Sequence, residues 1–230
     1  MIEKQEIIEA IDKIFKKTIF FKDFKLKKFS TGEVEWKHTN DKAAYNIGFG
    51  FQDRYEGYHL DQFNELIHVK NLESIVQPIF KNHQIETSEN EYTLINLSAH
   101  KDLYTKIVST PIANQKALEQ VCEWVKEYIT IDTIPFFQEK LTYKGMNAQI
   151  KDKNIEQLIE CGIDASYPAS IFKAMAIAYK ANDLTYYNAI KTELLEWYET
   201  DKADEDEDLS EYGDFEEALK DLDAKLQEDT

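Results

Sequence analysis

Residues 44–52, with the sequence AYNIGFGFQ, contain the pattern that decides the fold. Apolar residues alternate there with polar or small ones, and successive side chains of a β-strand point to opposite faces of its sheet. The apolar face consists of Tyr45, Ile47, Phe49 and Phe51. The other face consists of Asn46, Gly48, Gly50 and Gln52. We expect the apolar face to pack on helices, and the two glycines to leave the backbone of the other face open to close approach.

Further strand and helix patterns surround this stretch. Val34 and Trp36 alternate with charged residues before it, and residues 53–57 form a polar turn directly after it. Residues 63–69 are predicted as a strand, although Leu60, Phe63 and Ile67 also fit a helix, and residues 92–97 as a short buried strand. Apolar residues at helical spacing predict helices, most of them in the second half of the chain: 2–17, 71–80, 113–129, a helix that begins or kinks at Pro135, 155–159, and an antiparallel pair at 170–180 and 184–198.

These patterns predict an α+β fold. We expect a small, mostly antiparallel sheet covered by helices, followed by a helical C-terminal half and an acidic C-terminal tail. The domain prediction is a single domain over residues 1–198, sheet-rich over 1–110 and helical over 111–198, with the tail over 199–230. A chain of 230 residues with 43% hydrophobic residues is long and apolar enough to bury a folded core.

The negative charge of the chain is concentrated in its tail. The formal net charge is −17, and residues 199–230 hold 15 acidic residues and three lysines, a net charge of −12. The acidic block at 199–208 repels itself and favours a disordered linker. Beyond the block, apolar residues at helical spacing predict a short helix that docks on its own chain or on a partner. The candidate binding residues of this apolar stripe are Phe215, Leu219, Leu222 and Leu226.

A lysine cluster at residues 13–28 is the expected dock for the tail. It holds seven lysines and a single acid, and phenylalanines lie between the lysines. Such aromatic side chains can stack on single-stranded bases, whereas the alternative is a half-buried strand with a lysine outer face. The candidate binding residues here are Lys22, Lys25, Lys27 and Lys28. Because Arg54 is the only arginine and the chain is acidic, the sequence argues against a nucleic-acid partner.

Two His-x-Asp steps are the candidates for a catalytic site. A strand places the first and third residue of such a step on one face, which suits a His–carboxylate pair. The candidates are His59, Asp61, His100 and Asp102. The acidic block fails as a calcium loop because Leu209 and Phe215 occupy the places of the required glycine and glutamate. The sequence has no phosphate loop and no nucleophile elbow, so we expect no cofactor and no metal, and an enzyme of unknown class stays the alternative.

The compartment is predicted from charge and cysteine usage. The N-terminal residues are charged and no apolar run approaches 18 residues, so we expect neither a secretory signal nor a membrane partner. Cys122 and Cys161 are too few for a disulfide scaffold. We therefore expect reduced thiols in a cytoplasmic protein, and the sequence does not fix its oligomeric state.

Three segments resemble parts of a loose group of uncharacterised bacterial α+β domains. They are the strand at 44–52, the helix at 71–80 and the sequence TIPFF at 133–137. In that group an N-terminal helix precedes a small antiparallel sheet and further helices, and several related domains are thought to act as immunity proteins beside polymorphic toxins. The resemblance implies a non-enzymatic protein-binding role and brings no catalytic motif. An acidic protein of this kind would neutralise a basic partner by charge and shape complementarity.

Overall fold

The computed structural model describes residues 2–87, 92–97, 99–203 and 214–228. The chain divides into two compact units. Unit 1 comprises Met1–Asn40, Ala44–Leu66 and Asn96–Gln138, and unit 2 comprises Asp41–Ala43, Ile67–Ile95 and Glu139–Thr230. This division differs from the predicted boundary at residue 198, because the C-terminal helix packs within unit 2. Residues 204–208 of the predicted acidic linker lie outside the described residues.

A five-stranded antiparallel sheet confirms the predicted α+β class. Its strands follow one another in chain order: β1 (Lys25–Lys28), β2 (Val34–Thr39), β3 (Ala43–Arg54), β4 (Gly57–Val69) and β5 (Leu94–Ile95). Trp36 of β2 lies opposite Ile47 of β3. The predicted alternation of β3 is confirmed at its centre, because Ile47 and Phe49 are buried while Gly48 and Gly50 are only half-buried. It does not extend to the ends of the predicted stretch, since Asn46 is buried and Phe51 is half-buried.

β4 contains an irregularity at Gln62 that changes which side chains face the core. Gln62 has a φ of 51°, in the left-handed region that residues with a Cβ rarely adopt. Leu60 and Phe63 are both buried although they are three residues apart, as expected where one extra residue interrupts the alternation. The alternation then continues through Glu65 and Ile67, both buried, so the sequence brings a glutamate to the apolar face of the strand.

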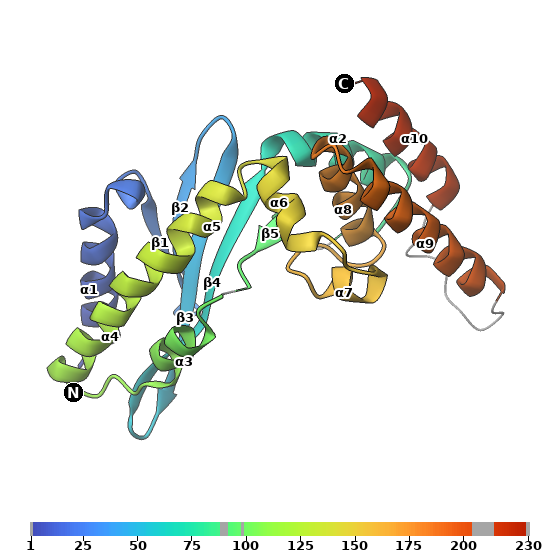
Figure 1. The fold of residues 1–230 in the computed structure, drawn as a ribbon. Coiled ribbons are helices and arrows are strands. Elements are labelled where there is room, and N and C mark those ends of the chain that lie inside the picture. The colour runs from blue at the N-terminus through green and yellow to red at the C-terminus, as the bar shows by residue number, and fades with distance from the viewer. Residues whose placement is uncertain (1, 88–91, 98, 204–213, 229–230) are drawn as a thin grey trace. The chain divides into compact units, whose positions relative to one another are not determined.

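Helices cover one face of the sheet in unit 1. They are α1 (Lys4–Lys17), α3 (Lys101–Ser109), α4 (Gln115–Tyr128) and α5 (Ile134–Glu139), with a 3₁₀ turn η1 (Ile19–Phe21) and a π-helix η2 (Ile129–Thr133) that joins α4 to α5. Figure 1 shows α1 and α4 side by side over the sheet. Phe15 of α1 packs edge to face on the buried Trp36, with ring centroids 4.7 Å apart. Phe63 of β4 packs in the same way on Tyr128 of α4, with ring centroids 5.8 Å apart. These contacts form the core of unit 1.

Unit 2 is built mainly from helices. They are α2 (Lys70–Asn82), α6 (Tyr143–Ile150), α7 (Ile155–Ile159), α8 (Ala169–Lys180), α9 (Leu184–Ala203) and α10 (Phe215–Glu228). α8 is the centre of the unit, because ten consecutive residues from Ala169 to Ala178 are buried. Neither α3 nor α6 was predicted, and α9 continues five residues beyond the expected end at Tyr198.

Candidate functional site

The tip of the β3–β4 hairpin is the first candidate site, and its backbone is held in place from a distant part of the chain. The backbone N–H of Ile112 donates to the carbonyl of Tyr58 at 2.8 Å, and the two residues form an isolated bridge. Gly57 has a φ of 139°, and a Cβ there would lie 3.0 Å from the backbone of Ile112 and Ala113. The close approach therefore requires glycine at this position.

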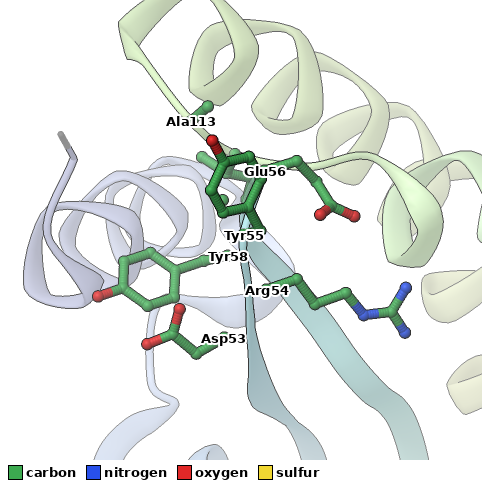
Figure 2. Close-up of a pocket in the computed structure, with 8 residues that line it drawn as sticks. Asp53, Arg54, Tyr55, Glu56, Tyr58 and Ala113 are labelled. Carbon is green, nitrogen blue, oxygen red and sulfur yellow. The ribbon is translucent and has the colours of Figure 1, made fainter.

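A pocket of about 380 Å³ opens at this tip. Its lining consists of Asp53, Arg54, Tyr55, Glu56, Gly57, Tyr58, Ile112 and Ala113. Figure 2 shows Asp53 and Tyr58 extending to one side of the hairpin, and Arg54 and Glu56 to the other. Tyr55 is fully exposed, with a relative exposure of 107%. A large aromatic side chain with a polar hydroxyl, held in solvent at a turn, is typical of a protein interaction site.

Charged groups surround the aromatic residues of the hairpin tip. Lys4 of α1 places its ammonium 5.2 Å from the ring centroid of Tyr58 and 5.7 Å from that of Phe51. Arg54 donates from Nη2 to Oε1 of Gln52 on the same strand. The tip thus combines electron-rich aromatic rings with charges of both signs.

The two predicted His-x-Asp steps do not combine into one site. His59 is buried and its Nε2 lies 3.4 Å from Oε1 of Glu56, so the charged neighbour that the structure gives it is Glu56 and not the predicted Asp61. His100 lies at the start of α3, and its backbone N–H donates to Oδ2 of Asp132 at 3.2 Å. The helix places Asp102 on an exposed turn beside His100, where the strand argument for a shared face does not apply.

His100 and Asp102 line a second pocket, an open groove of about 440 Å³ between α3 and α4. Trp124 and Ile131 contribute apolar surface to the groove, and Lys106 adds a positive charge. Lysines and acids alternate around the groove, so its lining does not favour a ligand of one charge.

A buried polar network lies within unit 1 around Glu65. The hydroxyl of Thr133 donates to Oε1 of Glu65 at 2.9 Å, and the amide of Asn96 donates to Oδ1 of Asp132 at 2.6 Å. Burial raises the pKa of Glu65 to about 8, the nearby charge of Asp132 adds to the rise, and hydrogen bonds from Thr133, Tyr128 and Asn96 oppose it. A carboxylic acid that keeps its proton at neutral pH can donate a hydrogen bond, and such groups occur in both active sites and structural networks.

The charges of Glu65 and Asp61 both act on the phenol of Tyr104. Burial raises the pKa of Tyr104, and the charges of Glu65 and Asp61 add to the rise. Sequence reasoning missed Glu65, although a single glutamate between Phe63 and Ile67 on an apolar strand face is a signal that could have found it.

The lysine cluster of residues 13–28 presents little aromatic surface, and the ammonium of Lys27 lies 4.3 Å from the ring centroid of the half-buried Phe29. Lys22, Lys25, Lys27 and Lys28 are all exposed, as predicted for an outer face. Other phenylalanines of this segment pack against the chain: Phe21 and Phe24 are buried, and the half-buried Phe20 stacks on Phe137 with ring centroids 6.1 Å apart. The alternative of a half-buried strand with a lysine face therefore describes this segment better than base stacking. Lysine on the edge strand β1 also disfavours pairing with other chains.

The apolar stripe of α10 docks on its own chain. Phe215, Leu219, Leu222 and Leu226 are all buried. They pack on α2 and α8, and not on the lysine cluster that we expected. α8 offers aromatic surface to the stripe, since the ring centroids of Phe215 and Phe172 are 5.9 Å apart. Polar contacts add to the apolar ones, since Asp221 lies 2.8 Å from the ring of His83. The four residues are thus unavailable to a partner while α10 is docked.

The remaining chemistry of the described chain is limited. No three or more histidine, cysteine, aspartate or glutamate side chains gather there as a possible metal site. Cys122 and Cys161 are free, and burial raises the pKa of Cys122 to about 11, which keeps its thiol protonated. None of the described helices has the length and apolar character needed to cross a membrane.

Comparisons with known proteins gave no match to a protein-family model, a curated protein or a solved structure.

Proposed function

We propose that this protein is a non-enzymatic protein-binding protein that engages a basic partner through the tip of the β3–β4 hairpin, in the manner of an immunity protein. The observation that carries the proposal is the full exposure of Tyr55 beside the hairpin pocket. Tyrosine is among the residues that dominate binding energy at interfaces, because it contributes a large contact area at a low cost in side-chain entropy.

The backbone around Tyr55 is suited to such a role. The bridge between Tyr58 and Ile112 and the ammonium of Lys4 over the Tyr58 ring hold the base of the turn. A turn that is already ordered loses less conformational freedom on binding than a mobile loop. The hairpin can therefore present Tyr55 to a partner with little further loss of backbone conformational entropy.

The charge of the chain supports a basic partner. A net charge of −17 repels acidic molecules and speeds the approach of basic ones, with an effect that weakens as salt is added. Long-range attraction of this kind selects the class of partner, whereas local contacts at Tyr55 supply the affinity.

A selection of displayed random peptides on the immobilised protein tests the proposal. We expect enrichment of peptides rich in lysine or arginine, with affinities that fall as salt is raised. Tyr55→Ala should weaken the selected peptides by about tenfold, the effect of losing one interface hot spot. Leu184→Ala is the matched control, because Leu184 is also an exposed apolar residue but lies on α9. Enrichment of acidic peptides, or equal binding by Tyr55→Ala and the parent protein, would contradict the proposal.

A further inference from the structure

The lining of the hairpin pocket has the chemistry of a receptor for a long cationic side chain. Asp53 and Glu56 supply carboxylates, and Tyr55 and Tyr58 supply phenol rings. Aromatic faces attract ammonium and guanidinium groups, and carboxylates pair with them. The remaining wall is apolar, as suits the methylene stem of lysine or arginine, which packs on apolar surface while its head stays polar.

The protein already contains one contact of this kind on the same hairpin. The ammonium of Lys4 lies over the rings of Tyr58 and Phe51, 5.2 and 5.7 Å from their centroids. The rings of this hairpin therefore accept a cation within the folded chain. A second cation from outside has the exposed ring of Tyr55 available.

Arg54 is the one residue of the pocket lining whose charge opposes a cation. Its Nη2 atom donates to Gln52, and Figure 2 shows its side chain on the side of the hairpin away from Asp53 and Tyr58. The repulsion from Arg54 thus acts mainly on the Glu56 side of the tip, and the ammonium of Lys4 adds a positive charge beside Tyr58. A volume of about 380 Å³ also lies at the low end of the range for small-molecule sites, so it has room for one long side chain.

We infer that the hairpin pocket takes one lysine or arginine side chain of the partner, on the Asp53 side of the tip, at the carboxylate of Asp53 and the exposed ring of Tyr55. This inference rests on the proposed function, and it names the chemistry by which the same site recognises its partner. The stem of the bound side chain lies against Ile112 and Ala113.

The test uses single amino-acid probes and the full chain. Acetyl-arginine amide and acetyl-lysine amide are titrated into the labelled protein, and backbone amide shifts are followed by NMR. We expect shifts concentrated at residues 53–58 and 112–113. Acetyl-citrulline amide has nearly the shape of the arginine probe without its charge, and it should bind at least about threefold more weakly.

Charge variants then separate local recognition from the net charge of the protein. Asp53→Asn with Glu56→Gln should weaken the arginine probe at least about threefold. Glu119→Gln with Glu123→Gln removes the same total charge from the exposed side of α4 and should change affinity by less than about twofold. Arg54→Ala should leave the affinity unchanged or increase it.

Equal binding of the citrulline and arginine probes, or shifts that lie only outside the hairpin, would overturn the inference. If peptides still bind through Tyr55 while the arginine probe does not, the inference fails and the proposed function stands. Loss of the dependence of peptide binding on Tyr55 contradicts the proposed function instead, so the two failures are distinguishable.

Discussion

Two buried glutamates, Glu65 in unit 1 and Glu73 in unit 2, differ in what surrounds their carboxylates. Oε1 of Glu73 lies 3.1 Å from the ammonium of Lys173, whose side chain is also buried. Thr93 donates a further hydrogen bond of 2.6 Å to the same oxygen. Glu65 accepts from the hydroxyl of Thr133 and lies near a second carboxylate, that of Asp132.

The difference teaches that surroundings, and not residue type, decide what a buried glutamate does. Lys173 also donates to the carbonyls of Tyr92 and Asp164, so the ion pair ties α8 and α2 to two loops and acts as a clamp. Glu65 instead holds a proton at neutral pH, because burial raises its pKa to about 8. Unit 2 therefore depends on a charge pair, whereas unit 1 contains a group that titrates.

The largest expected effect comes from removing the cation of the clamp. Lys173→Met keeps most of the side-chain volume but leaves the carboxylate of Glu73 buried without its partner, which should cost about 3–5 kcal/mol. Urea unfolding at pH 7 measures this loss, and adding Glu73→Gln to Lys173→Met should recover part of it. A loss below about 1 kcal/mol would show that the pair is not desolvated as the structure describes.

The next largest effect tests whether α10 unfolds cooperatively with the helices that the Glu73–Lys173 clamp joins. Leu222 is fully buried against helices of unit 2, so Leu222→Ala should cost about 3 kcal/mol through lost burial and a residual cavity. Hydrogen exchange should accelerate in α2 and α8 as well as in α10. Faster exchange in α10 alone would mean that α10 is an appendage that α2 and α8 do not need.

A graded effect, smaller for each pH unit than either substitution, is expected from the proton on Glu65. The folded-state pKa of about 8 lies above the ordinary value, so the folded state keeps its proton to a higher pH than the unfolded chain. The stabilisation is complete at pH values below the unfolded pKa, and it is lost as pH rises toward 8. The loss should approach about 1.4 kcal/mol per pH unit between pH 5 and pH 8.

Glu65→Gln should remove this slope, because glutamine cannot titrate. Unfolding free energies at several pH values, taken as the difference between parent and variant, isolate Glu65 from the other titrating groups. Glu119→Gln, at an exposed position of α4, should leave the slope in place. A slope that is unchanged in Glu65→Gln would mean that Glu65 is ionised in the fold.

Local sequence patterns predicted the elements of the fold better than the site. The alternation at residues 44–52 is enough to predict β3, because neighbouring side chains of a strand face opposite sides wherever the strand lies. The helices at 71–80 and 155–159 were predictable because the spacing of apolar residues along a helix is also a local pattern. α6 was missed because it contains Gly145 and its start depends on a cap from Thr142.

The candidate site could not be predicted because its parts meet only in the fold. Residues 53–57 were recognised as a polar turn, but the pocket there needs Ile112, which is more than 50 positions away in the chain. Glu65 likewise depends on Thr133, 68 positions further on. Neither spacing leaves a pattern in the sequence, since no short-range periodicity connects such residues.

The smallest expected effect compares backbone strain in the two units. Gln62 in β4 and Asn182 after α8 are both exposed, and both adopt a positive φ, of 51° and 62°. This conformation costs a residue with a Cβ about 1 kcal/mol, whereas glycine adopts it freely but loses more backbone entropy on folding. Asparagine tolerates the region better than glutamine, because its short side chain bonds to the local backbone.

Gln62→Gly should therefore stabilise the folded protein by about 0.5 kcal/mol, and Asn182→Gly should change its stability by less than that. Paired urea titrations measure the difference, and destabilisation by Gln62→Gly would show that the glutamine side chain makes contacts that outweigh the strain.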